Sequence, residues 1–369
     1  MKVVMVARDA APSKAFQMLG EELLKRRHFF HLFVGSGSPL TVSNDDIRQV
    51  VSKMDIVIVG MSSSKELAEP EMAAAEAAMN AGVPLVAYGD LFGTVNRQFF
   101  SELWQKTGKA PHMLFVLDDY EKQDAESKYP SSTKVIVTGN PAIEKAYFPE
   151  WTRKEAREKM GITDDDFVVI VPGGKDFRIN AQLFQTATVA MFEMWREEKG
   201  RAIKVFLATH PGDENVQNGK RPDEYFGLEN LGVSPRFTVK VFTKANSDPP
   251  TPKIVIGADG MIASMFTTGI DAAIQRVPVV DVITPYALER FGDISGGRTK
   301  WGPGELGASH AVYAYDYSQL KVLVRAVEYY FFGAGRNEML AAQKKAYPDI
   351  SKPVVIKKMA DALESIIEC

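Results

Sequence analysis

The sequence predicts an α/β protein with two doubly wound, Rossmann-like domains that face a central cleft. Three observations support this prediction. Short continuous runs of Val, Ile and Leu alternate with helical segments, which is typical of strands buried on both faces of a parallel sheet. The alternation starts again after a seam near residues 139–152. The chain has 369 residues, whereas a single hydrophobic core rarely keeps growing beyond ~250–300.

The first array of elements fills a proposed N-terminal domain, residues 1–145. Phe16, Leu19 and Leu23 recur at helical spacing after the first apolar run, and an Ala-rich helix ends at Gly82. We expect strands at 3–7, 29–34, 55–59, 84–88, 113–117 and 134–138, and helices at 15–27, 45–54 and 69–81.

The second array fills a proposed C-terminal domain, residues 146–345. We expect strands at 167–171, 204–208, 236–241, 254–256 and 279–282, and helices at 152–160, 180–197 and 318–332. The stretch 287–307 is rich in Gly, Arg and Lys and has no clear period. A last helix at 353–368 belongs to a third segment, 346–369, which we expect to pack back on the N-terminal domain.

The composition narrows the class of protein. Lys and Arg total 44 and Asp and Glu total 47, so the net charge of −3 offers no global positive field for nucleic acid. The single cysteine, Cys369, excludes an intramolecular disulfide, a cysteine zinc site and an iron–sulfur cluster. No run approaches the ~18–20 apolar residues of a membrane span, and the first apolar run is too short for a signal peptide. We therefore expect a soluble cytoplasmic protein.

Several common catalytic motifs do not occur in the sequence. The first strand leads into Arg8 and Asp9 instead of a G-x-G-x-x-G or Walker A loop, which disfavours classical nicotinamide dehydrogenases and P-loop enzymes. Neither a G-x-S-x-G elbow nor an H-E-x-x-H helix occurs. The five histidines lack the spacing of metal ligands, so we predict no metal site.

Two strand ends of the second array carry candidate polar groups. Gly173, Gly174 and Lys175 follow a buried strand, and such a turn lets backbone N–H groups and a lysine approach an anion. A plain tight turn would use the same residues. His210 and Pro211 follow the next strand, and the proline keeps the backbone extended so that the imidazole projects toward a phosphate or a ribose. Alternatively, the histidine forms hydrogen bonds to a neighbouring loop.

A third strand end leads into a helix through Thr267, Thr268 and Gly269. The free N–H groups and the positive dipole end of a helix N-terminus bind phosphate well. Asp271, in the expected first turn, could accept the hydroxyl groups of a ribose. The alternative is that one threonine caps the helix and Asp271 only favours the dipole.

These segments together resemble GT-B fold glycosyltransferases and UDP-N-acetylglucosamine 2-epimerases. The sequence VTGNP at 137–141 resembles the segment that closes the N-terminal domain of that superfamily, and 153–162 resembles the charged helix that follows it. The His210–Pro211 step and the sequence TTGIDAAIQRVP at 267–278 resemble the segments that hold the donor. The resemblance covers most of 135–285, and it implies a GT-B fold.

The resemblance also implies a nucleoside-diphosphate sugar, most often UDP-linked, as the ligand of the C-terminal domain. Asp271 would bind the ribose in place of the usual glutamate, and the usual glycine before Pro278 is missing, where this sequence has Arg276-Val277. The residues expected to surround the diphosphate are Gly173, Gly174, Lys175, His210, Thr267, Thr268 and Gly269.

The acceptor side offers two candidate bases in the first array. Asp90 follows a strand end between Gly89 and Gly93, and an exposed carboxylate there could take the proton of an acceptor hydroxyl. The stretch around it loosely resembles an acidic stretch of the epimerases. A turn or helix-capping role would explain Asp90 equally well, and the same holds for Asp9, the second candidate base. The basic residues Arg290, Arg298 and Lys300 could neutralise a leaving diphosphate or simply lie on a surface loop.

Two patterns are missing by comparison with the resembled family. No E-x7-E pattern precedes the donor helix and no Asp-x-Asp metal motif occurs, which favours an inverting, metal-independent transfer of a sugar to a hydroxyl acceptor. The alternatives are a non-hydrolysing UDP-sugar 2-epimerase, a CDP-polyol phosphotransferase and a catalytically silent nucleotide-sugar binder. We predict no cofactor besides the donor substrate. The sequence predicts neither the acceptor nor the oligomeric state.

Overall fold

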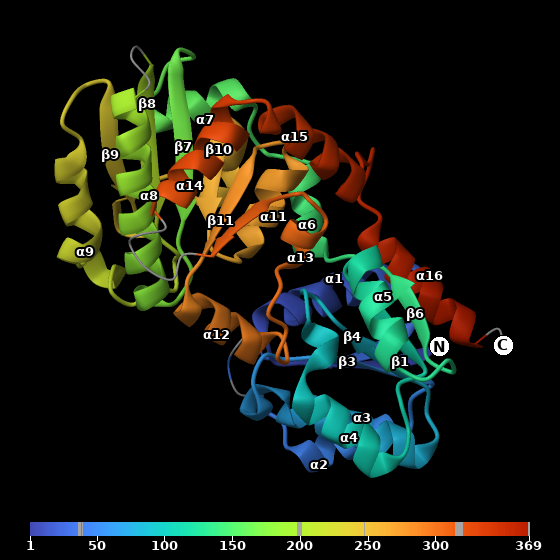
Figure 1. Ribbon diagram of the computed structural model, residues 1–369. Helices are drawn as coiled ribbons and strands as arrows, with labels where there is room; N and C mark the ends of the chain where they lie inside the picture. The colour runs from blue at the N-terminus through green and yellow to red at the C-terminus, as the bar shows by residue number, and fades with distance from the viewer. Residues whose placement is uncertain (36–37, 39, 198–200, 247, 314–319, 368–369) are drawn as a thin grey trace. The chain divides into compact units, whose positions relative to one another are not determined.

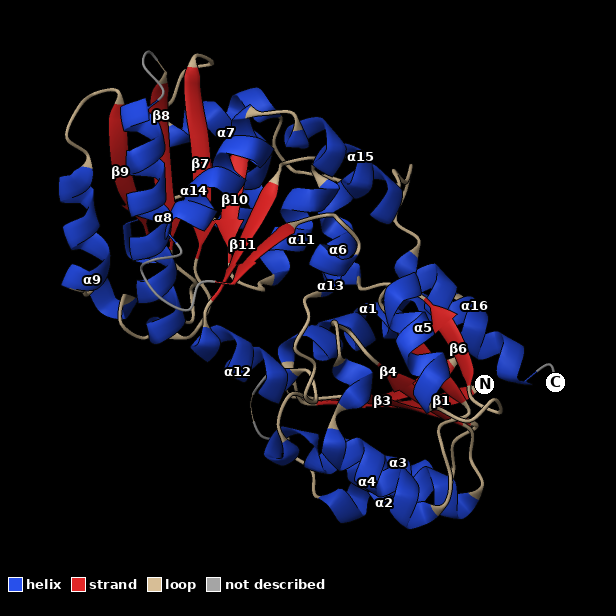
Figure 2. Cartoon of the chain, viewed as in Figure 1, coloured by secondary structure: helices blue, strands red, loops and turns tan. Residues whose placement is uncertain are grey.

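The computed structural model describes residues 1–35, 38, 40–197, 201–246, 248–313 and 320–367. The chain divides into two compact units. Unit 1 comprises Met1–Glu144, Phe291–Thr299 and Ser351–Cys369, and unit 2 comprises Lys145–Arg290 and Lys300–Ile350. Each unit has a six-stranded parallel sheet with helices on both faces (Figures 1 and 2). The predicted fold class, two doubly wound α/β units, is confirmed.

The sheet of unit 1 has the strand order β2-β1-β3-β4-β5-β6. Its strands are β1 (Lys2–Ala7), β2 (Phe29–Val34), β3 (Ile56–Gly60), β4 (Leu85–Tyr88), β5 (Met113–Val116) and β6 (Lys134–Val137). Its helices are α1 (Ala10–Lys25), α2 (Asn44–Val51), α3 (Lys65–Ala81), α4 (Gln98–Thr107), α5 (Asp119–Lys128), α6 (Pro141–Glu144) and α16 (Val355–Ile367), with a 3-10 turn η1 at Thr94–Asn96. The chain reverses its direction of winding between β1 and β3.

Alternate residues of each strand in unit 1 enter two separate cores. Val4 and Val6 of β1 pack toward the helices α2 to α5, whereas Val3 and Met5 pack toward α1 and α16. All four side chains are fully buried. A strand buried on both faces needs apolar residues at every position, which is why the sequence shows continuous runs instead of alternation.

The C-terminal helix α16 packs against α1, the first helix of the chain (Figure 1). Met359 and Leu363 are fully buried in the shared core. The Glu144 carboxylate accepts the backbone N–H groups of Val354 and Val355 at 2.5 and 2.9 Å, so a side chain distant in sequence satisfies the start of α16. Glu364 accepts from Arg26 at 2.8 Å and fixes the other end.

The sheet of unit 2 has the strand order β12-β11-β10-β7-β8-β9. Its strands are β7 (Asp166–Pro172), β8 (Ala202–Ala208), β9 (Phe237–Phe242), β10 (Gly260–Ala263), β11 (Val279–Ile283) and β12 (His310–Tyr313). Its helices are α7 (Arg153–Met160), α8 (Phe177–Glu197), α9 (Asp223–Phe226), α10 (Thr251–Ile254), α11 (Thr267–Ile274), α13 (Gly302–Glu305), α14 (Leu320–Val327) and α15 (Gly335–Ala346). Helix α12 (Pro285–Ile294) contains the boundary between Arg290 and Phe291.

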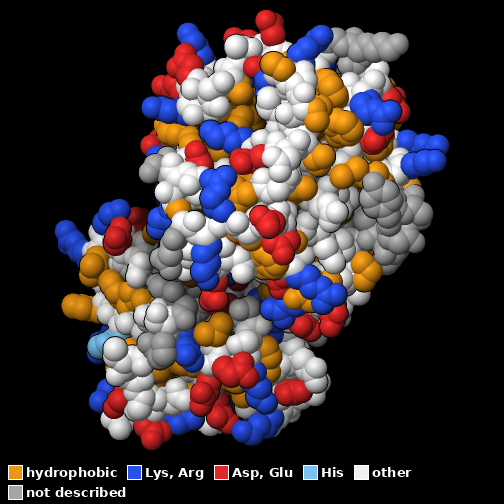
Figure 3. Space-filling view, turned by 90° about the vertical axis from the view of Figure 1, so that its left-hand side faces the viewer, with side chains coloured by type: hydrophobic (Ala, Val, Ile, Leu, Met, Phe, Trp, Pro, Cys, Tyr) orange, Lys and Arg blue, Asp and Glu red, His pale blue; other side chains and the backbone are white. Residues whose placement is uncertain are grey.

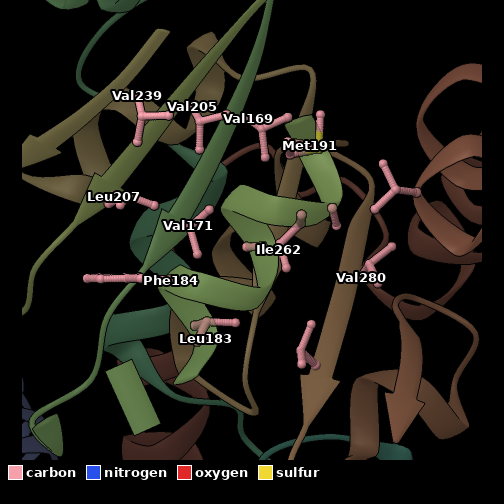
Figure 4. Close-up of a cluster of buried hydrophobic side chains, with 14 of the residues drawn as sticks. Val169, Val171, Leu183, Phe184, Met191, Val205, Leu207, Val239, Ile262 and Val280 are labelled. Carbon is pink, nitrogen blue, oxygen red and sulfur yellow. The ribbon is translucent and has the colours of Figure 1, made fainter. Parts of the chain in front are cut away.

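The long helix α8 covers one face of this second sheet (Figure 4). Its Leu183, Phe184 and Met191 lie against valines and leucines from β7 and β8, and all of them are almost fully buried. The opposite face packs against α7, α10 and α11. The direction of winding reverses between β7 and β10, so the loops that follow these two strands lie next to each other at the carboxyl edge of the sheet.

One predicted strand is wrong. Residues 254–256 belong to α10 and to the 3-10 turn η6 (Val255–Gly257), and the strand of this region is β10. Pro252 lies at the start of α10, where its fixed φ favours a helix. Ile254 and Val255 therefore pack into the core from helical turns, which the β-branched composition of the run did not indicate.

The stretch 287–307, which shows no period in the sequence, holds most of α12 and all of α13. Its central part, Phe291–Thr299, belongs to unit 1, whereas the prediction assigned it to the C-terminal domain. Arg298 is nearly buried there between the carboxylates of Glu121 and Asp124. This pairing occupies the guanidinium that we considered for neutralising a diphosphate. Residues 318, 319 and 368 of two predicted helices, and Cys369, lie outside the described residues.

The surface carries charges of both signs. Figure 3 shows basic and acidic side chains interspersed on one face, in agreement with the net charge of −3. Within the described ranges, no helix is both long enough and apolar enough to cross a membrane.

Leu363→Ala should lower the free energy of unfolding by about 2–5 kcal/mol, because it leaves a cavity between α16 and α1. Urea denaturation followed by circular dichroism measures the change. Lys357→Ala, on the exposed side of the same helix, is the matched control and should change stability by less than about 0.5 kcal/mol. Equal effects of the two substitutions would contradict the docking of α16.

Candidate functional site

The carboxyl edge of the unit 2 sheet brings together the loops that follow β7 and β10. A Cβ atom on Gly174, after β7, would lie 2.7 Å from the ring of Phe266, after β10. A Cβ atom there would force the Phe266 ring to move, so the observed contact between the two loops depends on glycine at position 174. In open α/β sheets a ligand binds at such a reversal of winding. The candidate site is therefore built around this contact.

The helix α11 starts at this edge without a side-chain cap. Its N-cap residue is Phe266, so neither Thr267 nor Thr268 caps the helix. Met265 has a left-handed backbone with φ of 54°, which turns the chain from β10 into the helix. Thr267 is exposed and Thr268 is half-buried. The N–H groups and the positive dipole end of this first turn are suited to an anion.

Beneath this turn lies Asp281, a residue of the strand that the sequence predicts at 279–282. It is fully buried in β11, and a Cβ atom on Gly269 would lie 3.8 Å from its Oδ1 atom. Burial raises the pKa of this carboxyl to about 6, and the facing Ser309 hydroxyl, Met265 backbone and Trp301 side chain counteract the rise. An acid in the middle of a valine-rich strand, Val279-Val280-Asp281-Val282, was the sequence signal for it.

His210 presents one ring nitrogen to the site. Its Nδ1 atom accepts the Gly212 N–H at 2.8 Å, so the neutral ring carries its proton on Nε2. Burial lowers the pKa of His210, the Lys175 charge lowers it further, and Asp213 partly counteracts both. His210 is thus a neutral N–H donor, which suits a phosphate or a hydroxyl oxygen.

The two glycines after β7 do not offer their own amides to a ligand. The Gly173 N–H donates to the Ala208 carbonyl at 2.7 Å, and the Gly174 N–H donates to Asn180 Oδ1 at 2.7 Å. The expectation that these N–H groups bind an anion therefore does not fit the geometry. Their loop instead positions Lys175, an exposed lysine that has no ion pair within the part of the chain that the structure describes.

A buried polar network holds the loops after β7 and β8 together. Asn180 Nδ2 donates to the Gly174 carbonyl at 2.8 Å and to Asp213 Oδ2 at 2.9 Å. The Tyr225 hydroxyl donates to the same Asp213 oxygen at 2.7 Å. Asn180 and Asp213 are fully buried, so each contact replaces a lost contact with water. The sequence contained no pattern that pointed to Asn180 or Tyr225.

Asp271 lies one helical turn from Thr267 on the same face of α11, as the fifth residue of the helix, so it is not in the first turn as we expected. Its carboxylate is half-buried and accepts no hydrogen bond from any described residue. Burial raises its pKa to about 7. A ligand hydroxyl that donates to this group would replace the solvation that Asp271 has lost.

In unit 1, Asp90 lies at the carboxyl edge of the sheet, after β4. Its backbone carbonyl accepts from Asn140 Nδ2 at 2.8 Å, and the nearest helical turn, η1, has Gly93 as its N-cap. The side chain is half-buried. Burial raises the pKa of Asp90 to about 6, nearby Arg97 counteracts the rise, and Asp9 adds to it. Asp90 is not a helix cap, which excludes the capping half of the alternative that we considered.

Asp9 is more tightly held by its surroundings. Its Oδ2 atom accepts the Ser63 N–H at 2.6 Å, and its N–H donates to the Ser62 hydroxyl at 3.0 Å. Fully buried Glu71 of α3 accepts from the backbone N–H groups of Arg8 and Ser62 and from the Ser62 hydroxyl. These bonds join the loops after β1 and β3. Burial raises the pKa of Glu71 to about 7 against the effect of its donors.

Comparisons with known proteins give matches at the level of structure. No protein-family model and no curated protein matches the sequence. Among solved structures, MurG of Acinetobacter baumannii aligns with a TM-score of 0.60 and 14% identity over 99% of each chain. The S. aureus MnaA–UDP structure aligns with a TM-score of 0.61 and 11% identity, over 100% of this chain and 97% of that one.

A third similar structure is UDP-GlcNAc 2-epimerase from Neisseria meningitidis bound to UDP-GlcNAc. Its TM-score is 0.58 and its identity 14%, over 99% of this chain and 100% of the other. At such identities the likeness shows the fold. The neighbours have the GT-B fold and the alignments span nearly the whole chain. The chain therefore has the GT-B fold, the architecture shared by MurG and the UDP-GlcNAc 2-epimerases.

Proposed function

We propose that the protein is a glycosyltransferase that moves a sugar from a UDP-sugar to a hydroxyl acceptor in one inverting, metal-independent displacement. The observation that carries the proposal is that three groups share the carboxyl edge of one sheet: the uncapped N-terminus of α11, the neutral Nε2–H donor of His210, and Lys175, which has no ion pair among the described residues. Backbone dipoles, one neutral donor and one cation suit a diphosphate that gains negative charge as its bond to the sugar breaks.

The roles in unit 2 follow from this assignment. The N–H groups of Thr267 and Thr268 bind diphosphate oxygens, and His210 donates to another oxygen or to a ribose hydroxyl. Lys175 offsets the charge of the leaving UDP. Asp271 accepts the ribose hydroxyls, since its carboxylate has lost water without gaining a donor among the described residues. Gly173 and Gly174 contribute close packing instead of hydrogen bonds to the ligand, and the Gly269 N–H donates to the Phe266 carbonyl within the turn.

Asp90 of unit 1 is our candidate for the general base. A base is most effective when its pKa lies near the working pH, and the pKa of Asp90 is raised to about 6. The Arg97 guanidinium is 4% exposed and favours the ionised form of Asp90. Asp9, the second candidate, already accepts a backbone N–H and its carboxylate is less free to take a proton.

A UDP-sugar 2-epimerase is the second candidate function, because several similar structures carry that name. One observation weighs against it. The acid that follows His210, Asp213, is fully buried and accepts from Asn180 and Tyr225. Pro211 and Gly212, between them, carry no charge. An epimerase converts the UDP-sugar without any acceptor, so product analysis with the donor alone separates the two activities.

UDP should raise the melting temperature of the full chain. At ~100 times its dissociation constant a ligand stabilises the folded state by ~2.7 kcal/mol. A thermal-shift panel of UDP, CDP, GDP and their sugars measures the preference. A shift with CDP-linked ligands alone would favour the polyol-phosphate alternative, and no shift with any nucleotide would contradict the glycosyltransferase proposal.

His210→Ala should weaken UDP binding about tenfold or more, because hydrogen bonds to charged groups contribute ~1.5–3 kcal/mol. Thr268→Ala should change affinity less, since the helix amide remains. Isothermal titration measures both. His112→Ala, an exposed histidine of unit 1, is the control and should bind UDP like the parent chain. Unchanged affinity in His210→Ala would remove His210 from the donor site.

Asp90→Asn should abolish acceptor-dependent release of UDP and leave UDP affinity nearly intact. The base must be ionised, so the parent rate should fall as the pH drops below about 6 and level off above it. Asp165→Asn, an exposed acid of unit 2, serves as the control. Full turnover in Asp90→Asn would exclude Asp90 as the base, and UDP binding without turnover in the parent would indicate a silent binder.

A further inference from the structure

Unit 1 contains a pocket that lies outside the candidate site. Its volume is about 360 Å³, within the ~300–1,000 Å³ of small-molecule sites. It is bounded by α4, the end of α5 and η1, the turn that follows the Asp90 loop. The residues that matter to its chemistry are Val95, Ser101, Trp104, Gln105, Tyr129 and Gly296.

Two aromatic side chains form part of its wall, and their polar atoms already have partners. Trp104 Nε1 donates to the Tyr129 hydroxyl at 3.3 Å, and that hydroxyl donates to the Val95 carbonyl at 3.1 Å. Phe100 stacks on Trp104 with 5.8 Å between ring centroids. Because these polar atoms are paired, the two side chains offer a ligand mainly ring carbon atoms, and Trp104 is 9% exposed.

The charges near the pocket are paired with each other. Lys128 Nζ binds Asp124 at 2.9 Å and also donates to Asn96 Oδ1. Asn96 Nδ2 donates to the same aspartate at 2.7 Å. The exposed amide of Gln105 has no hydrogen-bond partner among the described residues, and the Ser101 hydroxyl makes only a 3.4 Å contact to the Arg97 carbonyl. A ligand would thus meet a neutral amide and a neutral hydroxyl.

The wall is completed by the segment Phe291–Thr299. A Cβ atom on Gly296 would lie 2.2 Å from the Asn96 carbonyl carbon, and the φ of Gly296 is +69°, so only glycine allows this contact. Arg298 fixes the segment through Glu121 and Asp124. The contact of Gly296 with Asn96 and the ion pairs of Arg298 therefore fix this side of the pocket.

We propose that this pocket binds an uncharged sugar residue of the acceptor. A sugar ring combines an apolar C–H face, which packs on aromatic rings, with hydroxyl groups that pair with an amide and a hydroxyl. A phosphate would need an unpaired cation, and a flat apolar molecule would leave the Gln105 amide unused. The acceptor role rests on the proposed function, whereas the binding of sugar is testable without it.

Saturation-transfer NMR on the full chain without nucleotide tests the proposal. The probes are neutral tetrasaccharides of glucose, mannose, galactose and N-acetylglucosamine. At least one should bind, Gln105→Ala should weaken it about fivefold, and Ser101→Phe, which fills the pocket, should abolish binding. Gln98→Ala is the matched control, because Gln98 lies on the same helix and pairs with Glu102 outside the pocket.

Three results would overturn the proposal: no binding of any probe at millimolar concentration, equal binding by the Ser101→Phe variant, or displacement of the sugar by excess UDP. The chain could bind sugar as expected and yet bind no nucleotide. That result would confirm the pocket as a sugar site and refute only the proposed function.

Discussion

Every strand-to-strand pairing within the two sheets is parallel, and this constraint governs the rest of the molecule. Parallel neighbours require a crossover connection, so helices cover both faces and the strands become apolar throughout. All strands of a sheet then end at the same edge. Residues far apart in the sequence, such as Gly174, His210 and Phe266, therefore share the carboxyl edge of the unit 2 sheet.

The loops at these edges keep their shape through buried polar groups. Asp213 accepts from Asn180 and Tyr225, and Glu71 accepts from two backbone amides and a hydroxyl. A buried carboxylate is tolerable only when donors replace water, and the same donors must then stay in place. In each unit this requirement joins two loops that follow different strands.

Two segments of the chain join a unit far from their neighbours in sequence. Phe291–Thr299 and Ser351–Cys369 both belong to unit 1, although unit 2 residues precede each of them. Ion pairs and caps hold them, namely Arg298 with Glu121 and Asp124, and Glu144 with the start of α16. The chain therefore passes between the two units several times, and neither unit is a continuous piece of sequence.

The sequence by itself determined the fold class, because strands buried on both faces of a sheet require continuous apolar runs. Such runs can be recognised in a single sequence. It also indicated His210, Asp90 and the segment around Thr267, since each follows such a run. Local sequence patterns failed where the same residues are compatible with a helix or a strand. The β-branched run 254–256, predicted as a strand, is helical, and the strand of this region is the four-residue β10. Tertiary structure alone decided that Gly173 and Gly174 use their amides internally and that Arg298 is paired. It also decided that Asn180 and Glu71 support the loops. Hydrogen bonds between residues distant in sequence depend on how the strands are ordered in space. That order cannot be inferred from the local patterns of a single sequence.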